Sequence, residues 1–103
     1  MATSPKINTP YYAVIFTSVR AELDDGYAET AKAMLDLAST QPGFLGFESA
    51  RQEIGITISY WDSLESIEKW KNNEQHRQAQ ARAREWYSQF RVRVCLVGRE
   101  YGF

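Results

Sequence analysis

The stretch from Tyr11 to Val19 limits the possible folds more than any other part of the chain. It is rich in β-branched and aromatic residues, and apolar side chains occupy both of its alternating sets of positions. Because neighbouring side chains of a strand point to opposite faces of a sheet, this pattern predicts a strand that is covered on both faces. The fold therefore needs packing partners on both sides of the sheet that contains this strand.

Alternation and helical stripes predict the order of the remaining elements. Strands are expected at 44–51, 56–61 and 90–97, and helices at 27–39, from 62 to a break at 72–73, and at 74–88. The spacing of Asp62 and Glu65 is that of a capping box, so we expect Asp62 to cap the short helix and Glu65 to reach back to it. The order β-α-β-β-α-α-β predicts an α+β domain of the ferredoxin-like, split βαβ type with a four-stranded antiparallel sheet.

A single layer of helices leaves the second face of such a sheet uncovered, although the strands carry apolar residues on both faces. An exposed apolar face of this size predicts a partner surface, and a homodimer with twofold symmetry is the simplest way to cover it. We expect the folded domain to span residues 10–103, behind a flexible polar tail at residues 1–9.

Charge and cysteine content argue against several classes of protein. The chain has 12 basic and 13 acidic residues, without the basic excess of a protein that binds nucleic acid or an anionic membrane. No apolar run is long enough to cross a bilayer, and residues 1–9 lack the apolar segment of a signal peptide. The single cysteine, Cys95, fits a cytoplasmic location, and with one histidine far from it in sequence we expect no metal site.

The candidate functional residues gather between Gly55 and Tyr87, which include all three tryptophans and the only histidine. His76 can exchange protons near neutral pH, so it is a candidate general base, or else it makes only a structural hydrogen bond. Trp70 and Trp86 either wall an aromatic-binding pocket or pack in the core. Tyr60 bonds either a substrate oxygen or a protein group.

The order of several motifs resembles the antibiotic biosynthesis monooxygenase (ABM) superfamily over residues 11–101. These motifs are Gln41-Pro42-Gly43-Phe44-Leu45-Gly46-Phe47-Glu48, Tyr60-Trp61-Asp62-Ser63, the helix with Ile67 and Trp70, His76, and the Trp86-Tyr87 helix before the last strand. The resemblance implies a dimeric α+β barrel with a pocket between sheet and helices in each subunit. Some members oxidise aromatic polyketides or quinols with molecular oxygen and no metal or flavin, others degrade haem, and many have no established activity.

From the residues and the resemblance together we expect a cofactor-independent monooxygenase that acts on an aromatic or quinol-type molecule. His76 and Trp70 would be catalytic, with Trp70 at the family's tryptophan position. Tyr60, Trp86 and Phe16 would contact the substrate. The alternative is a domain of the same fold that binds a small molecule or serves in assembly without catalysis, because a fold alone does not fix a function.

Haem degradation is disfavoured by two departures from that branch of the family. The resemblance places the haem-ligating histidine about three helical turns after Trp70, where this chain has Gln80. The branch also needs an asparagine on the first strand, and the nearest one here, Asn8, precedes that strand. Trp70 alone matches.

Overall fold

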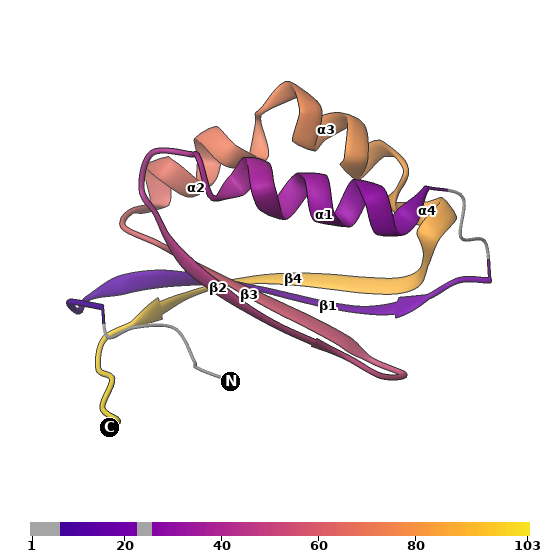
Figure 1. Ribbon diagram of the computed structural model, residues 1–103. Helices are drawn as coiled ribbons and strands as arrows, with labels where there is room; N and C mark the ends of the chain where they lie inside the picture. Colours follow the sequence, from indigo (N-terminus) through magenta and orange to yellow (C-terminus); the bar gives the residue numbers. More distant parts are fainter. Residues whose placement is uncertain (1–6, 23–25) are drawn as a thin grey trace.

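The computed structural model describes residues 7–22 and 26–103, and most of the expected N-terminal tail lies outside these ranges. The elements run in the order β1 (Tyr11–Arg20), α1 (Tyr27–Ala38), β2 (Phe44–Arg51), β3 (Gly55–Trp61), α2 (Leu64–Lys71), α3 (Glu74–Ala81), α4 (Ala83–Trp86) and β4 (Tyr87–Val97). The strands form one antiparallel sheet in the order β2-β3-β1-β4. The helices lie on one side of the sheet and the C-terminal tail on the other (Figure 1). The ferredoxin-like α+β prediction is confirmed.

The strand register sorts side chains between the two faces of the sheet. Tyr12 of β1 lies opposite Trp61 of β3 and Leu96 of β4. The Trp61 ring stacks on Trp70 of α2, so the even-numbered positions 12–18 of β1 belong to the helix-side face. The odd-numbered positions, beginning with Tyr11, belong to the opposite face, called the distal face below.

The cap of α2 differs from the expected capping box. Ser63, not Asp62, is the N-cap, and its Oγ accepts a hydrogen bond from the Ser66 backbone N–H at 3.1 Å. The Asp62 backbone N–H is committed to the sheet end, where it donates to the Gly43 carbonyl at 2.8 Å. Glu65 pairs with Lys69 at 3.2 Å and does not reach back. The N-cap of the helix is therefore Ser63, one residue later than predicted, because the backbone of Asp62 is still hydrogen-bonded at the end of the sheet.

The prediction of one continuous helix over residues 74–88 is also wrong. The helix breaks at Arg82, continues as the single turn α4, and gives way to β4 at Tyr87. Tyr87 pairs with Arg20 of β1, and the Ala21 backbone N–H donates to the Trp86 carbonyl at 2.8 Å. These bonds to β1 favour strand geometry over the helical stripe that the sequence suggested, and β4 starts three residues earlier than predicted.

The helices leave part of their own side of the sheet uncovered. Four apolar side chains of β4 share the helix-side face with Tyr12, Val14 and Phe16, yet remain 46–62% exposed: Phe90, Val92, Val94 and Leu96. We call this row, with Val14 and Phe16, the helix-side floor. In the described ranges, the fully packed apolar residues are few: Tyr11, Ala13, Ala38, Trp61 and Trp86. No helix in the same ranges is both long and apolar enough to cross a membrane.

Gly43 supports the turn between α1 and β2, and this role can be tested. Its φ is 85°, and an added Cβ would overlap the side chains of Asp62 and Ser66. We expect Gly43→Ala to lower the free energy of unfolding by at least about 1 kcal/mol, because a left-handed backbone is unfavourable for alanine. Gly98→Ala is the control, since a Cβ there meets nothing within 4 Å. Urea unfolding measures both, and equal midpoints would contradict the role of Gly43.

Candidate functional site

Three aromatic rings connect the sheet to the helix pair α2–α3. The Trp70 ring stacks on the His76 ring with centroids 4.1 Å apart and planes 11° apart, and on the Trp61 ring at 6.3 Å and 24°. Asn73 makes this possible, because its side chain caps α3 by accepting from the His76 backbone N–H at 3.1 Å. The break between the two helices thus brings His76 back onto Trp70, a contact that the sequence did not predict.

The contacts of His76 bear on which ring nitrogen carries its proton. Nδ1 lies 3.0 Å from the Trp70 carbonyl oxygen, which can only accept, so this contact is a hydrogen bond in the tautomer that carries the proton on Nδ1. Gln80 Nε2 lies 3.2 Å from Nδ1 and donates to the Lys71 carbonyl at 3.2 Å. Nε2 of His76 has no hydrogen-bond partner among residues 7–22 and 26–103, and keeps its lone pair. This tautomer leaves Nε2 as the nitrogen able to take up a proton.

Burial decides the charge of His76. It lowers the pKa of the imidazole below its usual value of 6.5, and the bond to the Trp70 carbonyl opposes this only in part. The ring is therefore neutral at pH 7. A neutral ring with a free lone pair is the form that a general base requires.

A second group of rings lies at the opposite end of the helix-side face. We call it the aromatic corner, and it comprises Phe16, Tyr27, Trp86, Tyr87 and Phe90. Tyr87 contacts the rings of Phe16 at 5.3 Å and Tyr27 at 5.6 Å, both edge-on, and Phe16 contacts Phe90 at 6.0 Å. The corner is built from residues of α1, α4, β1 and β4.

Trp86 and Phe16 occupy different places in this corner. Trp86 is 4% exposed and meets Tyr27 edge-on at 5.9 Å, while the Arg82 guanidinium lies 4.5 Å from its ring centroid. Trp86 therefore lies in the core, beneath the other rings of the corner. Phe16 lies in the middle of the sheet between Thr57 and Val92, half-buried, and is part of the helix-side floor.

Tyr60 lies on the distal face, away from both ring groups. It pairs with Ala13, and its hydroxyl donates to Glu48 Oε1 at 2.5 Å. Burial and then the Glu48 bond raise the pKa of this phenol well above 10, so it stays protonated. The expectation that Tyr60 faces a pocket between sheet and helices is therefore wrong. A period-two pattern identifies which residues share a face but not which face the helices cover.

The helix-side floor joins the ring stack to the aromatic corner. Along β1 the distance from the Trp61 row at Tyr12 to the row at Ser18 is six residues, or about 20 Å at the rise of a strand. Between them lie Val14 and Phe16, flanked by the exposed side chains of β4. This apolar strip is long enough for a planar molecule of several fused rings. The alternation of β4 predicted the row in sequence, but not that it would stay uncovered.

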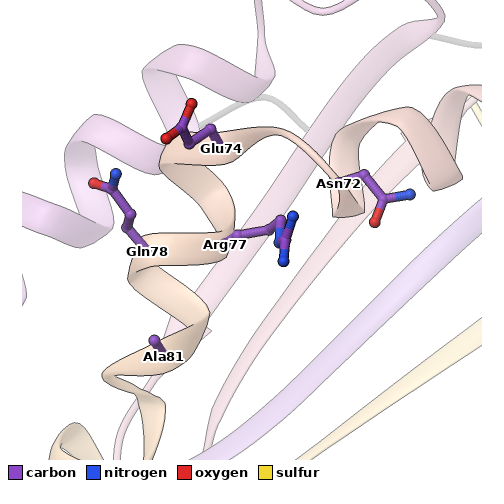
Figure 2. Close-up of a pocket in the computed structure, with 5 residues that line it drawn as sticks. All are labelled: Asn72, Glu74, Arg77, Gln78 and Ala81. Atoms are coloured by element: carbon purple, nitrogen blue, oxygen red, sulfur yellow. The ribbon is translucent and has the colours of Figure 1, made fainter.

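A separate hollow on the helix layer contains none of the candidate residues. Its volume is about 560 Å³, and its lining residues, all exposed, are Asn72, Glu74, Arg77, Gln78 and Ala81 (Figure 2). His76 and Trp70 do not line it. In the described part of the chain, no three His, Cys, Asp or Glu side chains come together as a metal site.

The lowered pKa of His76 predicts a pH-dependent stability. Between the folded pKa and 6.5 the unfolded chain binds the proton and the folded chain does not, so His76 destabilises the fold as pH falls. We expect wild type to lose more unfolding free energy than His76→Gln between pH 8 and pH 5, measured by urea unfolding. Arg77→Gln, an exposed neighbour, should follow the wild-type slope. Parallel slopes for wild type and His76→Gln would contradict the lowered pKa.

Comparison with known proteins agrees with this fold. The family model of antibiotic biosynthesis monooxygenases matches residues 10–82. The uncharacterized protein YqjZ of Bacillus subtilis (strain 168) is 51% identical over 94 residues, which are 88% of this chain and 82% of YqjZ. A variant of SnoaB, a cofactor-independent oxygenase from Streptomyces nogalater, superposes with a TM-score of 0.76 at 9% identity over 88% of this chain and 95% of that one.

Rv0793 from Mycobacterium tuberculosis superposes with a TM-score of 0.73 at 12% identity, over 91% of this chain and 98% of that one. At such identities the structural likeness shows the fold alone. The family match and the 51% identity to YqjZ establish the relationship independently of the structure. The chain therefore belongs to the antibiotic biosynthesis monooxygenase family.

Proposed function

We propose that this protein binds a planar phenol or quinol on the helix-side floor and oxygenates it with molecular oxygen and no cofactor. The observation that carries the proposal is the orientation of His76, whose Nδ1 proton is held by the Trp70 carbonyl while Nε2 keeps a free lone pair. Family membership and the likeness to a cofactor-independent oxygenase support the reaction class.

The reaction begins when Nε2 of His76 takes the phenol proton. In a substrate whose para carbon carries a hydrogen, the phenolate then passes one electron to oxygen, and the resulting radical and superoxide combine to form a carbon–oxygen bond at that carbon. His76 returns its proton to the peroxide and then removes the proton from the same carbon. The O–O bond breaks, hydroxide leaves as water after taking up that proton, and a quinone remains. One oxygen atom enters the product and the other enters water.

Trp70 and Phe16 have supporting roles in this scheme. Trp70 fixes the His76 ring twice, through the 4.1 Å ring stack and through its backbone carbonyl. Phe16 offers a ring surface on the floor for an edge-on or offset contact with the substrate.

A non-catalytic binding domain is the second candidate. It is favoured by the ring stack itself, because Trp61, Trp70 and His76 form a continuous packing contact between sheet and helices. In this alternative His76 is structural, and the floor binds an aromatic molecule that leaves unchanged. The two candidates predict the same binding but different oxygen consumption.

We also propose that two copies associate through the distal face, as the family resemblance implies. This face carries Ile15 and Ile58, which lie opposite each other at the centre of the sheet, and Ile56, which is 42% exposed. The helices cover none of it (Figure 1). A second copy would bury these apolar side chains.

Oxygen uptake separates catalysis from binding. With a panel of 1-naphthols and anthrones, we expect the wild type to consume oxygen and His76→Gln to be slower by roughly a hundredfold, the usual loss of a general base. Arg77→Gln is the control and should keep the wild-type rate. Equal rates for His76→Gln and wild type would remove His76 from the mechanism. Binding without uptake by either would favour the second candidate.

Sedimentation tests the association. We expect the wild type to be a dimer at micromolar concentration and Ile58→Asp to be monomeric, because the charge would lie on the distal face. Ile54→Asp is the control, since Ile54 is 59% exposed in the β2–β3 turn. A monomeric wild type, or a dimeric Ile58→Asp, would contradict the proposal.

A further inference from the structure

The end of the helix-side floor farthest from His76 contains a positioned arginine. Ser18 is 3% exposed, the one buried polar residue in the described ranges, and its Oγ accepts a hydrogen bond from Arg51 Nη2. The guanidinium lies over Gly55, where an added Cβ would overlap Nη2 and Cζ. Arg51, Gly55 and Ser18 form one row across β2, β3 and β1, and Phe90 continues it on β4. Arg51 is thus held on the helix-side face by its hydrogen bond to the buried Ser18 hydroxyl, and its guanidinium occupies the space that Gly55 leaves by having no side chain.

The charge of Arg51 is not matched by a carboxylate. No ion pair involves Arg51 in the part of the chain that the structure describes, and its one side-chain hydrogen bond goes to the neutral Ser18. A guanidinium has five N–H donors in a planar fork, and most of them remain available here. Exposed arginines are often simply solvated, but this one is fixed in position beside an apolar surface.

A pair of hydroxyls adds donors at the same end. The Tyr87 and Tyr27 hydroxyl oxygens lie 3.1 Å apart, so one of their two hydrogens is used within the pair and the other is left for a further acceptor. Tyr87 pairs with Arg20 of β1, two residues beyond Ser18, so the hydroxyl pair lies at the same end of the sheet as the Arg51 guanidinium. Arg20 also lies 3.4 Å from the Tyr27 ring centroid and donates to the Trp86 carbonyl at 3.1 Å. It therefore helps to fix Tyr27.

Apolar rings adjoin these donors. Phe16 and Phe90 contact each other at 6.0 Å and contact Tyr87 at 5.3 and 6.4 Å. A cation and a hydroxyl hydrogen beside a ring surface suit one kind of ligand group, a planar anion joined to an aromatic ring. The guanidinium fork matches the two oxygens of a carboxylate.

We propose that Arg51 and the Tyr27–Tyr87 hydroxyl pair form a subsite for the carboxylate of an aromatic ligand whose rings lie over Phe16 and Phe90. This inference deepens the proposed function and rests on it, since it assigns the second end of the same floor. The substrate is then an aromatic acid that carries its phenol toward His76 and its carboxylate toward Arg51. A system of several fused rings is long enough to span the floor between His76 and Arg51.

Isothermal titration with 2-naphthoate and 2-naphthamide tests the subsite, because the two probes have nearly the same shape and differ in charge. We expect the wild type to bind the acid about tenfold more tightly than the amide, as one charge-assisted hydrogen-bond pair provides. Arg51→Met and Arg51→Gln should both lose this preference while binding the amide as before. Arg93→Met is the matched control, because Arg93 is an exposed arginine on the distal face of β4, and it should keep the preference.

The outcomes separate the subsite from the proposed function. A wild type that binds acid and amide equally would overturn the carboxylate subsite and leave the aromatic-binding floor intact. Loss of preference in Arg93→Met as well as in the Arg51 variants would also overturn it, since the effect would then be one of net charge. Failure of the wild type to bind either probe would overturn the subsite together with the floor. The acid–amide comparison in the wild type needs no variant, so it holds even if an Arg51 variant does not fold.

Discussion

The ring of Trp61 is the contact on which the arrangement of sheet, helices and site depends. It is fully buried, meets Phe44 of β2 edge-on at 5.4 Å, and stacks on Trp70 of α2. Its Nε1–H donates to Ser59 Oγ at 2.9 Å, so the polar atom of the ring is satisfied inside the sheet layer. The orientation of α2, and through it the position of His76, follows from this one side chain. Few other residues in the described ranges are so completely buried, so the contact between helices and sheet depends on a small number of side chains.

The two ends of the helix-side floor differ in their electrostatics. One end adjoins Trp61, whose ring leads through Trp70 to the neutral imidazole of His76, and the other holds the cations Arg20 and Arg51 with two phenolic hydroxyls. Between them the surface is apolar and partly exposed. A ligand that has a polar group at each end would thus bind in one direction only.

The sequence predicted the element order, because that order follows from local patterns. Periodicity defines a strand or a helix within a few residues, and the break at 72–73 was visible as two asparagines. The start of β4 was not predictable in this way. It depends on the pairing of Tyr87 with Arg20, residues that are far apart in the chain, and on the Ala21–Trp86 backbone bond.

The sequence also did not predict which face of each strand would be turned toward the helices. Tyr60 and Trp61 are neighbours, and only the contact of Trp61 with α2 determines that Tyr60 points away from the helices. Likewise, nothing in the spacing of Ser18 and Arg51 along the chain predicted that these two side chains would meet. Their association arises because Gly55 lies between them in the sheet and leaves room for the guanidinium. Such cross-strand relations exist only once the register is known.

Through the Trp70 carbonyl, the geometry of the site depends on whether the last turn of α2 is ordered. This oxygen accepts both from the Asn73 backbone N–H, at 3.1 Å, and from Nδ1 of His76, so it closes α2 and orients the imidazole at once. Carbonyls in the last turn of a helix carry partial negative charge, which favours the Nδ1–H tautomer while that turn is intact. If the turn frays, the ring loses its acceptor, the two tautomers become comparable, and the basic nitrogen no longer has a fixed position. If His76 is the base, a ligand that orders the α2–α3 junction would therefore also fix the nitrogen that accepts the proton.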